Sequence, residues 1–232
     1  MTRGAARTPQ AERGGGRRRR PLTRRRLMGL DRSGPDPVQT RAGQPLRPFT
    51  LPNLIGYVRL AGIPVFLYLA LSSGDGRVAS ASILYAVIAA GDYVDGFVAR
   101  ATGQYSRMGA ILDPVVDRLT ILAGVVVCWH FELLPRWLLA LVVARELITL
   151  ALAQVGLRRG IELEINWMGR IAVFFVMGGI FWAMVLDGWV PAALVILGLV
   201  LSSLATVLYV RVGIARATPA TSEREAPASR GP

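Results

Sequence analysis

Four aspartates in two neighbouring apolar stretches are the residues best placed to do chemistry. The first stretch reads Asp92-Tyr-Val-Asp95-Gly96-Phe-Val-Ala99-Arg100, and after eight further residues the second reads Gly109-Ala-Ile-Leu-Asp113-Pro-Val-Val-Asp117. On a helix, positions 92, 95, 96 and 99 share one face, and so do positions 109, 113 and 117. Because the joint between the stretches is short, we expect two antiparallel helices whose acidic faces lie at the same depth and point toward each other.

These acids stand where ionised groups are costly. A charge at the centre of a membrane helix costs at least ~2.5 kcal/mol, so its presence indicates function by default. The alternative is that both helices end here and the acids are interfacial, which explains their tolerance but not their spacing.

A divalent metal site is the chemistry that this pattern favours. Four carboxylates in one apolar pocket repel each other unless cations neutralise them, and oxygen ligands select Mg²⁺ or Mn²⁺. Two such ions about 4 Å apart can bridge a pyrophosphate and stabilise a transferring phosphoryl group. Gly96 and Gly109 leave room for a ligand, or serve close helix packing. Arg100 could pair with a phosphate, or extend to the interface as an ordinary terminal arginine.

The elements that carry these residues are predicted to be membrane helices. The chain has 232 residues, of which 53% are hydrophobic and 18% charged. Each of six apolar stretches is near the ~20 residues that a bilayer requires. The stretches are 49–71, 79–101, 108–131, 136–157, 168–187 and 189–212. We therefore predict an all-α, six-transmembrane-helix bundle over residues 49–213, with disordered tails over 1–48 and 214–232.

Arginine placement predicts the orientation of the bundle. One side has only Arg77 and Arg136, whereas the other receives the N-terminal tail and the remaining joints. Under the positive-inside rule, both termini and the acidic site face the cytoplasm of a multi-pass cell-membrane protein.

The basic tail raises a different possibility. All 27 basic residues are arginines, and 13 of them lie in residues 1–48. Such a tail could bind nucleic acid, but no aromatic residue lies among the arginines, so contact with anionic lipid headgroups is favoured and no nucleic-acid partner is expected.

The acidic pattern resembles the signature of the CDP-alcohol phosphotransferases, Asp-x2-Asp-Gly-x2-Ala-Arg-x8-Gly-x3-Asp-x3-Asp, at every specified position. The six-span layout extends the resemblance over roughly residues 49–213. The resemblance implies transfer of a phosphatidyl group from CDP-diacylglycerol to an alcohol with release of CMP, two divalent cations as cofactors, and a homodimer.

The resemblance also implies roles for individual residues. The implied metal ligands are Asp92, Asp95, Asp113 and Asp117. Asp117 would also be the general base on the acceptor hydroxyl. The positions matched to binding of the CDP-lipid are Asn53, Gly96, Arg100, Ser106 and Gly109. The first span opens Pro52-Asn53-Leu-Ile-Gly56-Tyr-Val-Arg59, as in phosphatidylglycerophosphate and cardiolipin synthases, although Gly56 replaces the usual Thr or Ser.

The acceptor is expected to be anionic. Arg118, Arg145 and Arg170 are the candidates for binding its phosphate. The alternative for Arg145 is a partnership with Glu146 or an aspartate that only holds the bundle together. The Ala-Arg-Glu-Leu-Ile run resembles phosphatidylglycerophosphate synthases, whereas the Asp117-Arg118 pair resembles a subgroup assigned to cardiolipin synthesis. We favour glycerol 3-phosphate as the acceptor, with phosphatidylglycerol second.

Two non-enzyme classes compete with this interpretation. A cation transporter also has acids within its spans, but it would tend to show inverted repeats and broken helices, and neither is visible in the sequence. A purely structural membrane protein with a basic lipid-binding tail would have no activity, so replacing the aspartates would leave none to lose.

Overall fold

The computed structural model describes residues 45–158 and 167–217, and the part of the chain that it describes is helical, without strands. The predicted tails lie largely outside these residues. The helices are α2 (Leu51–Leu71), α3 (Ala79–Thr102), α4 (Arg107–His130), α5 (Arg136–Arg158), α6 (Trp167–Ala183) and α7 (Val190–Ala217). The all-α prediction is confirmed, and the predicted stretches agree with the helices to within a few residues at most ends.

The count of membrane spans is confirmed only in part. Four helices, α2, α3, α5 and α7, are long and apolar enough to cross a membrane. Helix α6 ends at Ala183, four residues before the predicted end, and is a shorter apolar helix. Helix α4 has 24 residues but contains Asp113, Asp117 and Arg118, and it is not among the four.

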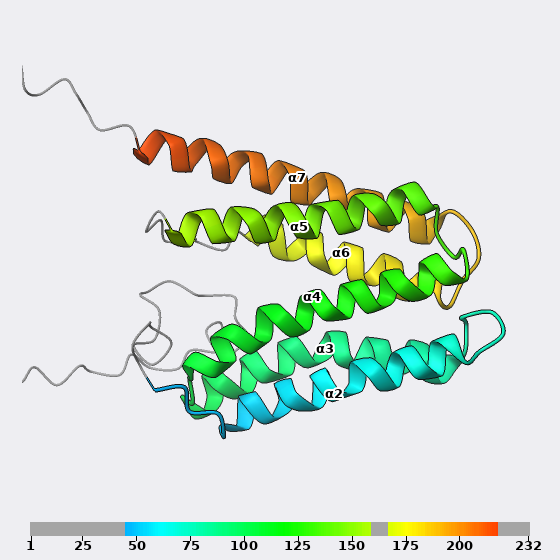
Figure 1. Ribbon diagram of the computed structural model, residues 1–232, viewed down its shortest axis with the longest axis horizontal. Helices are drawn as coiled ribbons and strands as arrows, with labels where there is room; N and C mark the ends of the chain where they lie inside the picture. The colour runs from blue at the N-terminus through cyan, green and yellow to red at the C-terminus, as the bar shows by residue number, and fades with distance from the viewer. Residues whose placement is uncertain (1–44, 159–166, 218–232) are drawn as a thin grey trace, which may run out of the picture.

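The helices form an elongated bundle with two halves (Figure 1). Helices α2, α3 and α4 pack together in one half, α6 and α7 form the closest pair in the other, and α4 joins the halves by contacting α5 and α6. The start of α2, the end of α3, the start of α4 and the end of α7 all lie at one end of the bundle. We call this the motif end, and the opposite end the loop end.

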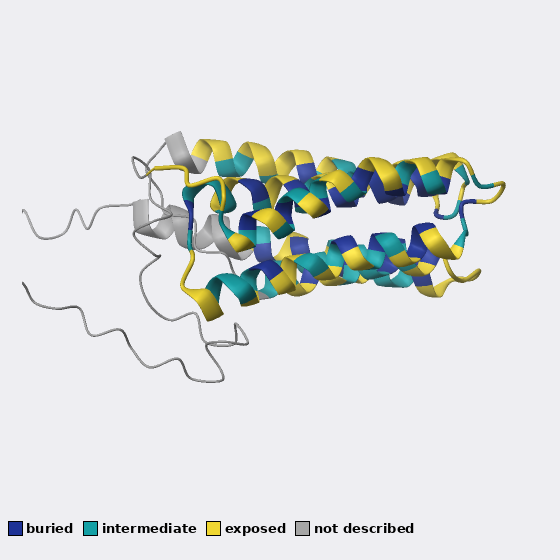
Figure 2. Cartoon of the chain, turned by 90° about the horizontal axis from the view of Figure 1, so that it is seen from below, coloured by how far each residue is buried: buried dark blue, intermediate teal, exposed yellow. Residues whose placement is uncertain are grey.

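An apolar core runs between the two halves. Its fully buried side chains include Phe66, Tyr85, Val116, Leu138 and Ile180. Buried positions face the interior of the bundle, and exposed positions follow the outer faces of the helices (Figure 2). Many of the exposed side chains are large and apolar, such as Val58, Tyr68 and Phe174, as expected for a surface that contacts lipid.

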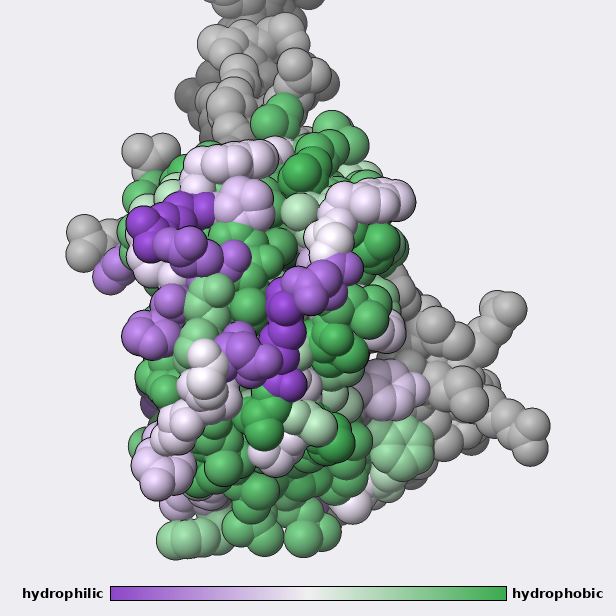
Figure 3. All heavy atoms as spheres, turned by 90° about the vertical axis from the view of Figure 1, so that its right-hand side faces the viewer, coloured by the Kyte–Doolittle hydropathy of each residue, from purple (hydrophilic) through white to green (hydrophobic). Residues whose placement is uncertain are grey.

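The loop end carries hydrophilic side chains among apolar ones (Figure 3). Arg77, between α2 and α3, pairs with Asp187, between α6 and α7, at 2.5 Å. Glu132 and Arg136 form a second pair at 2.5 Å. The Arg77–Asp187 pair joins two loops at this end of the bundle, away from the acidic motif.

The joint between α3 and α4 is built by local sequence. Gly103 ends α3 with a left-handed backbone, at φ 67°, which is favourable for glycine. Ser106 then caps α4, because its hydroxyl accepts a hydrogen bond from the backbone N–H of Gly109 at 2.9 Å. The short turn brings the acidic segments of both helices to the motif end, as the spacing predicts.

Candidate active site

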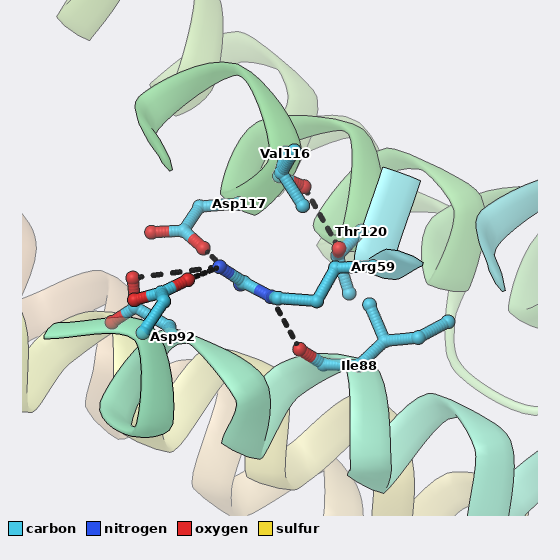
Figure 4. Close-up of polar contacts among 7 residues, drawn as sticks. Arg59, Ile88, Asp92, Val116, Asp117 and Thr120 are labelled. Carbon is cyan, nitrogen blue, oxygen red and sulfur yellow. Dashed lines mark hydrogen bonds and ion pairs between the residues drawn. The ribbon is translucent and has the colours of Figure 1, made fainter. Parts of the chain in front are cut away.

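A single guanidinium lies among the aspartates of the motif (Figure 4). Arg59, from α2, donates to Asp95 at 2.9 Å and to Asp117 at 2.6 Å, and it lies 3.7 Å from Asp92. We call Arg59 and these three aspartates the Arg59 cluster. The cluster joins three helices, because Asp92 and Asp95 belong to α3 and Asp117 to α4.

Exposure differs strongly within the Arg59 cluster. The side chains of Arg59 and Asp95 are each only 3% exposed, whereas Asp117 is 31% and Asp92 53% exposed. Asp95 therefore lies in the interior beside Arg59, and Asp92 and Asp117 stand at its open side. A ligand would meet the latter two carboxylates first.

The acidic faces converge, but not in the way that the sequence predicts. The four aspartates were expected to face each other directly, and Arg59 instead bridges three of them. Asp113 lies within electrostatic range of the other three aspartates and of Arg59. Among the described residues, no three His, Cys, Asp or Glu side chains are positioned to enclose a metal ion as they stand.

The donor set nevertheless fits a hard divalent cation. It consists of carboxylate oxygens alone, which Mg²⁺ and Mn²⁺ prefer. Three of the carboxylates already surround one cationic group, and one guanidinium cannot neutralise four aspartates. The residues that would hold the ions are those that the motif indicates.

A cavity of about 160 Å³ adjoins the Arg59 cluster. Asp95 and Asp113 form part of its wall. All five residues matched to CDP-lipid binding also line it, namely Asn53, Gly96, Arg100, Ser106 and Gly109. Residues from α2, α3 and α4 that are far apart in the sequence thus meet around one space next to the carboxylates.

Asn53 is held by the protein itself. Its amide nitrogen donates to the carbonyl oxygens of Arg47 and Pro48, each at 3.0 Å, and its amide oxygen accepts from the Ser106 hydroxyl at 2.9 Å. A Cβ at Gly109 would lie 2.8 Å from that amide oxygen, so a glycine is needed where α4 passes. Asn53, one of the positions matched to CDP-lipid binding, lines the cavity, and these hydrogen bonds fix its side chain in the wall.

Gln104 extends the same wall. Its side-chain oxygen accepts from the backbone N–H of Leu51 at 3.1 Å, at the start of α2. The backbone N–H of Met108 donates to the carbonyl of Leu46 at 3.1 Å. The segment before α2 is therefore fastened to the joint between α3 and α4.

Arg100 also lines the cavity. A Cβ at Gly96 would be 3.2 Å from a terminal nitrogen of Arg100, so the guanidinium folds back along α3 above the glycine. A phosphate in the cavity would have this cation beside it.

A second charged group joins α4, α5 and α7. Arg118 donates to the backbone carbonyl of Glu146 at 3.2 Å, and its guanidinium lies 3.8 Å from the Glu146 carboxylate. Arg145 pairs with the same carboxylate and donates to the Ser202 hydroxyl at 2.7 Å. We call Arg118, Arg145, Glu146 and Ser202 the Glu146 cluster. The alternative of an Arg145–Glu146 partnership is thus present in the structure.

The third arginine predicted to meet the acceptor stands apart from this cluster. Arg170, near the start of α6, is half-buried and within electrostatic range of Asp92 and Arg100. The structure therefore brings Arg118 and Arg145 together, and it places Arg170 on the side of Asp92.

The sequence interpretation missed the central position of Arg59 and the role of Glu146 as a shared partner. For Arg59 a signal existed, because an arginine within an apolar span needs a buried acidic partner. Glu146 was considered only as a neighbour of Arg145. Its contact with Arg118 could not be read from the sequence, since it depends on how α4 and α5 pack.

Comparison with known proteins shows the family of the chain. Residues 49–220 match the family model described as CDP-alcohol phosphatidyltransferase. The chain is 34% identical to a cardiolipin synthase (CMP-forming) of Streptomyces coelicolor, over 76% of this chain and 85% of that protein.

Two further relatives bear a different name, CDP-diacylglycerol–glycerol-3-phosphate 3-phosphatidyltransferase. The protein of Bacillus subtilis is 30% identical over 53% of this chain and 70% of its own length. That of Escherichia coli is 31% identical over 58% of this chain and 76% of its own length. Together with the motif and its placement, these matches show that the chain belongs to the CDP-alcohol phosphatidyltransferase family.

Proposed function

We propose that this membrane protein transfers the phosphatidyl group of CDP-diacylglycerol to a hydroxyl of a glycerol-containing acceptor and releases CMP. The observation that carries the proposal is the cavity lined by the motif residues, with the Arg59 cluster at its edge. Membership of the family supports the reaction class.

Different parts of the site would bind the CDP group and accept the proton of the acceptor hydroxyl. The cavity between α2, α3 and α4 would bind the CDP group, with Arg100 beside its phosphates. Asp117 stands partly exposed at the edge of the cluster, where it can accept the proton of an attacking hydroxyl. That oxygen then attacks the β-phosphorus, and the bond to CMP breaks.

The metal part of the proposal concerns the four aspartates. We infer that Asp92, Asp95, Asp113 and Asp117 hold two divalent cations, Mg²⁺ or Mn²⁺. When bound, such ions would offset the negative charge of the pyrophosphate and of the departing CMP.

Two glycerol compounds are candidates for the acceptor. Glycerol 3-phosphate, which the Ala-Arg-Glu-Leu-Ile run favours, agrees with the names of the Bacillus and Escherichia relatives. Phosphatidylglycerol is the second candidate, and the Streptomyces relative named cardiolipin synthase (CMP-forming), matched over 85% of its length, supports it. So does the Glu146 cluster, because Glu146 offsets part of the charge that Arg118 and Arg145 could offer to a small dianion.

One experiment tests both the reaction and the acceptor. The purified full chain is incubated with CDP-diacylglycerol, Mg²⁺ or Mn²⁺, and either acceptor, and the CMP and lipid products are identified. Acceptor-dependent CMP release with phosphatidylglycerophosphate as product supports glycerol 3-phosphate, and cardiolipin as product supports phosphatidylglycerol. No CMP release with any alcohol would contradict the proposal and favour the transporter alternative.

We also propose a multi-pass arrangement with both termini and the site on the cytoplasmic side. The three helix ends beside the cavity lie at the motif end, and the arginine distribution favours the cytoplasm for this end. Cys128 is the only cysteine and is buried, so single reporter cysteines can be read without removing it. Asp75→Cys should react with an impermeant thiol reagent from outside intact cells, and Gly103→Cys only after lysis. The reverse pattern would contradict the orientation.

The remaining parts of the proposal concern assembly and the tails. The expected homodimer is testable by measuring the mass of the protein in detergent or nanodiscs. The proposed boundaries place the enzyme in residues 49–213, so removal of residues 1–40 should leave activity intact. Loss of activity would show that the tail does more than contact lipid.

A further inference from the structure

Arg59 is fixed in a way that leaves its guanidinium little freedom. Its Nε donates to the backbone carbonyl of Ile88 at 2.9 Å, and one terminal nitrogen donates to Asp117 (Figure 4). The other terminal nitrogen donates to Asp95. The planar group is thus held by α3 on one edge and shared between α3 and α4 on the other.

The backbone of α3 makes room for the stem of this side chain. A Cβ at Gly91 would lie 2.6 Å from Cδ, 2.9 Å from Cγ and 3.0 Å from Nε of Arg59. Gly91 directly precedes Asp92 but stands outside the family signature given above. A residue with no side chain is therefore positioned where the stem of Arg59 passes α3.

The charge balance gives Arg59 a role beyond packing. A buried carboxylate such as Asp95 is strongly destabilised unless a cation accompanies it. Arg59 supplies that cation without a metal, but its single charge leaves the cluster negative. A divalent ion entering the cluster meets both the remaining negative charge and the positive charge of Arg59.

We propose that Arg59 is a built-in countercation of the metal-free enzyme, which holds Asp95 and Asp117 in place until divalent ions bind and then competes with those ions for the same carboxylates. The proposal rests on the use of divalent cations by the four aspartates. It predicts that Arg59 stabilises the empty protein and weakens metal binding, two effects of opposite direction from one side chain.

The test measures Mn²⁺ binding rather than turnover. The full chain and its Arg59→Gln variant are purified without metal, and free Mn²⁺ is followed by electron paramagnetic resonance during titration. Thermal unfolding is recorded with chelator and with saturating Mn²⁺. We expect Arg59→Gln to unfold at a lower temperature than the wild type in chelator. Saturating Mn²⁺ should raise its unfolding temperature by more than it raises that of the wild type. The variant should also bind Mn²⁺ at least about tenfold more tightly, because a nearby positive charge is removed.

A second variant keeps the charge but moves it. Gly91→Ala should push the stem of Arg59 aside and change Mn²⁺ affinity in the same direction, by a smaller factor. It decides the question if Arg59→Gln does not fold. Gly178→Ala, in α6 with no atom within 4 Å of the added Cβ, is the matched control and should bind Mn²⁺ as the wild type does.

The outcomes separate this inference from the proposed function. A purely structural arginine would lower the unfolding temperature but leave Mn²⁺ affinity unchanged or weaker in the folded variants, which would overturn the inference. A wild-type protein that binds no Mn²⁺ would instead contradict the proposed metal site, and the countercation role would fall with it.

Discussion

Two charged clusters in the bundle have opposite imbalances. In the Arg59 cluster one guanidinium serves three aspartates, whereas in the Glu146 cluster one carboxylate serves two guanidiniums. In each cluster the central residue is almost fully buried, and two of its charged partners are more exposed, Asp92 and Asp117 beside Arg59 and Arg118 and Arg145 beside Glu146. The first cluster is therefore suited to attract cations and the second to attract anions.

The two clusters are neighbours because of α4. Asp117 belongs to the Arg59 cluster and Arg118, the next residue, to the Glu146 cluster. Successive residues on a helix point about 100° apart, so α4 presents the acid toward α2 and the base toward α5. The proposed reaction would require a cation-binding region and an anion-binding region side by side. Asp117 and Arg118 show that one turn of α4 is enough to separate them.

The largest effect is expected at Asp117. Asp117→Asn keeps the size of the side chain but cannot accept the acceptor's proton, so CMP release should fall about 10³-fold. The variant should still bind CDP-diacylglycerol, which is measured as the change in unfolding temperature that the lipid causes. Asp75→Asn, at the loop end, is the control with wild-type activity. Turnover near the wild-type rate in Asp117→Asn would remove this residue as the base.

Glu146 should matter chiefly for stability. Glu146→Gln leaves two arginines around a neutral, buried side chain, and breaking such a pair costs about 3 kcal/mol. Chemical unfolding in detergent measures this loss. An unchanged free energy of unfolding would show that the two arginines do not depend on Glu146.

Arg118 should distinguish the two clusters in function. Arg118→Gln removes positive charge from the Glu146 cluster alone, so the KM for the acceptor should rise about tenfold, or ~1.4 kcal/mol, with the KM for CDP-diacylglycerol little changed. Steady-state kinetics with each substrate varied in turn measures both values. Equal increases in the two KM values would argue against a separate anion region.

The smallest effect is expected for the ion pair at the loop end. Arg77 and Asp187 are 26% and 83% exposed, and exposed pairs contribute only ~0–1 kcal/mol. Arg77→Gln should therefore shift the free energy of unfolding by about 0.5 kcal/mol, and the rate of CMP release should not change. A large loss of activity would mean that the loop end influences the site through the bundle.

Much of the fold could be predicted because its signals are local. Apolar stretches of span length each specify their own segment, and the structure confirms that they form helices. The left-handed Gly103 and the cap at Ser106 are local features too, which the structure adds. The end of α6 at Ala183 could not be predicted, because residues 184–186 are as apolar as the helix before them and the first charged residue is Asp187.

The candidate site was predictable in part. Helical periodicity placed the four aspartates on facing surfaces, and the five residues matched to the CDP-lipid do line one cavity. The position of Arg59 among them depends on the packing of α2 against α3 and α4, which no spacing within one helix encodes. The hydrogen bonds from the Asn53 side chain to the backbone carbonyls of Arg47 and Pro48 likewise depend on the path of the chain before α2.

Metal dependence of CMP release tests the central claim most directly. The purified chain is stripped with chelator and assayed with CDP-diacylglycerol and its acceptor while Mg²⁺ or Mn²⁺ is titrated back, beside the Asp92→Asn and Asp113→Asn variants. Our account predicts no CMP release without metal, recovery on titration in the wild type, and a shift of the titration to higher metal concentration in both variants. CMP release that persists in chelator, or variants that titrate as the wild type does, would contradict it.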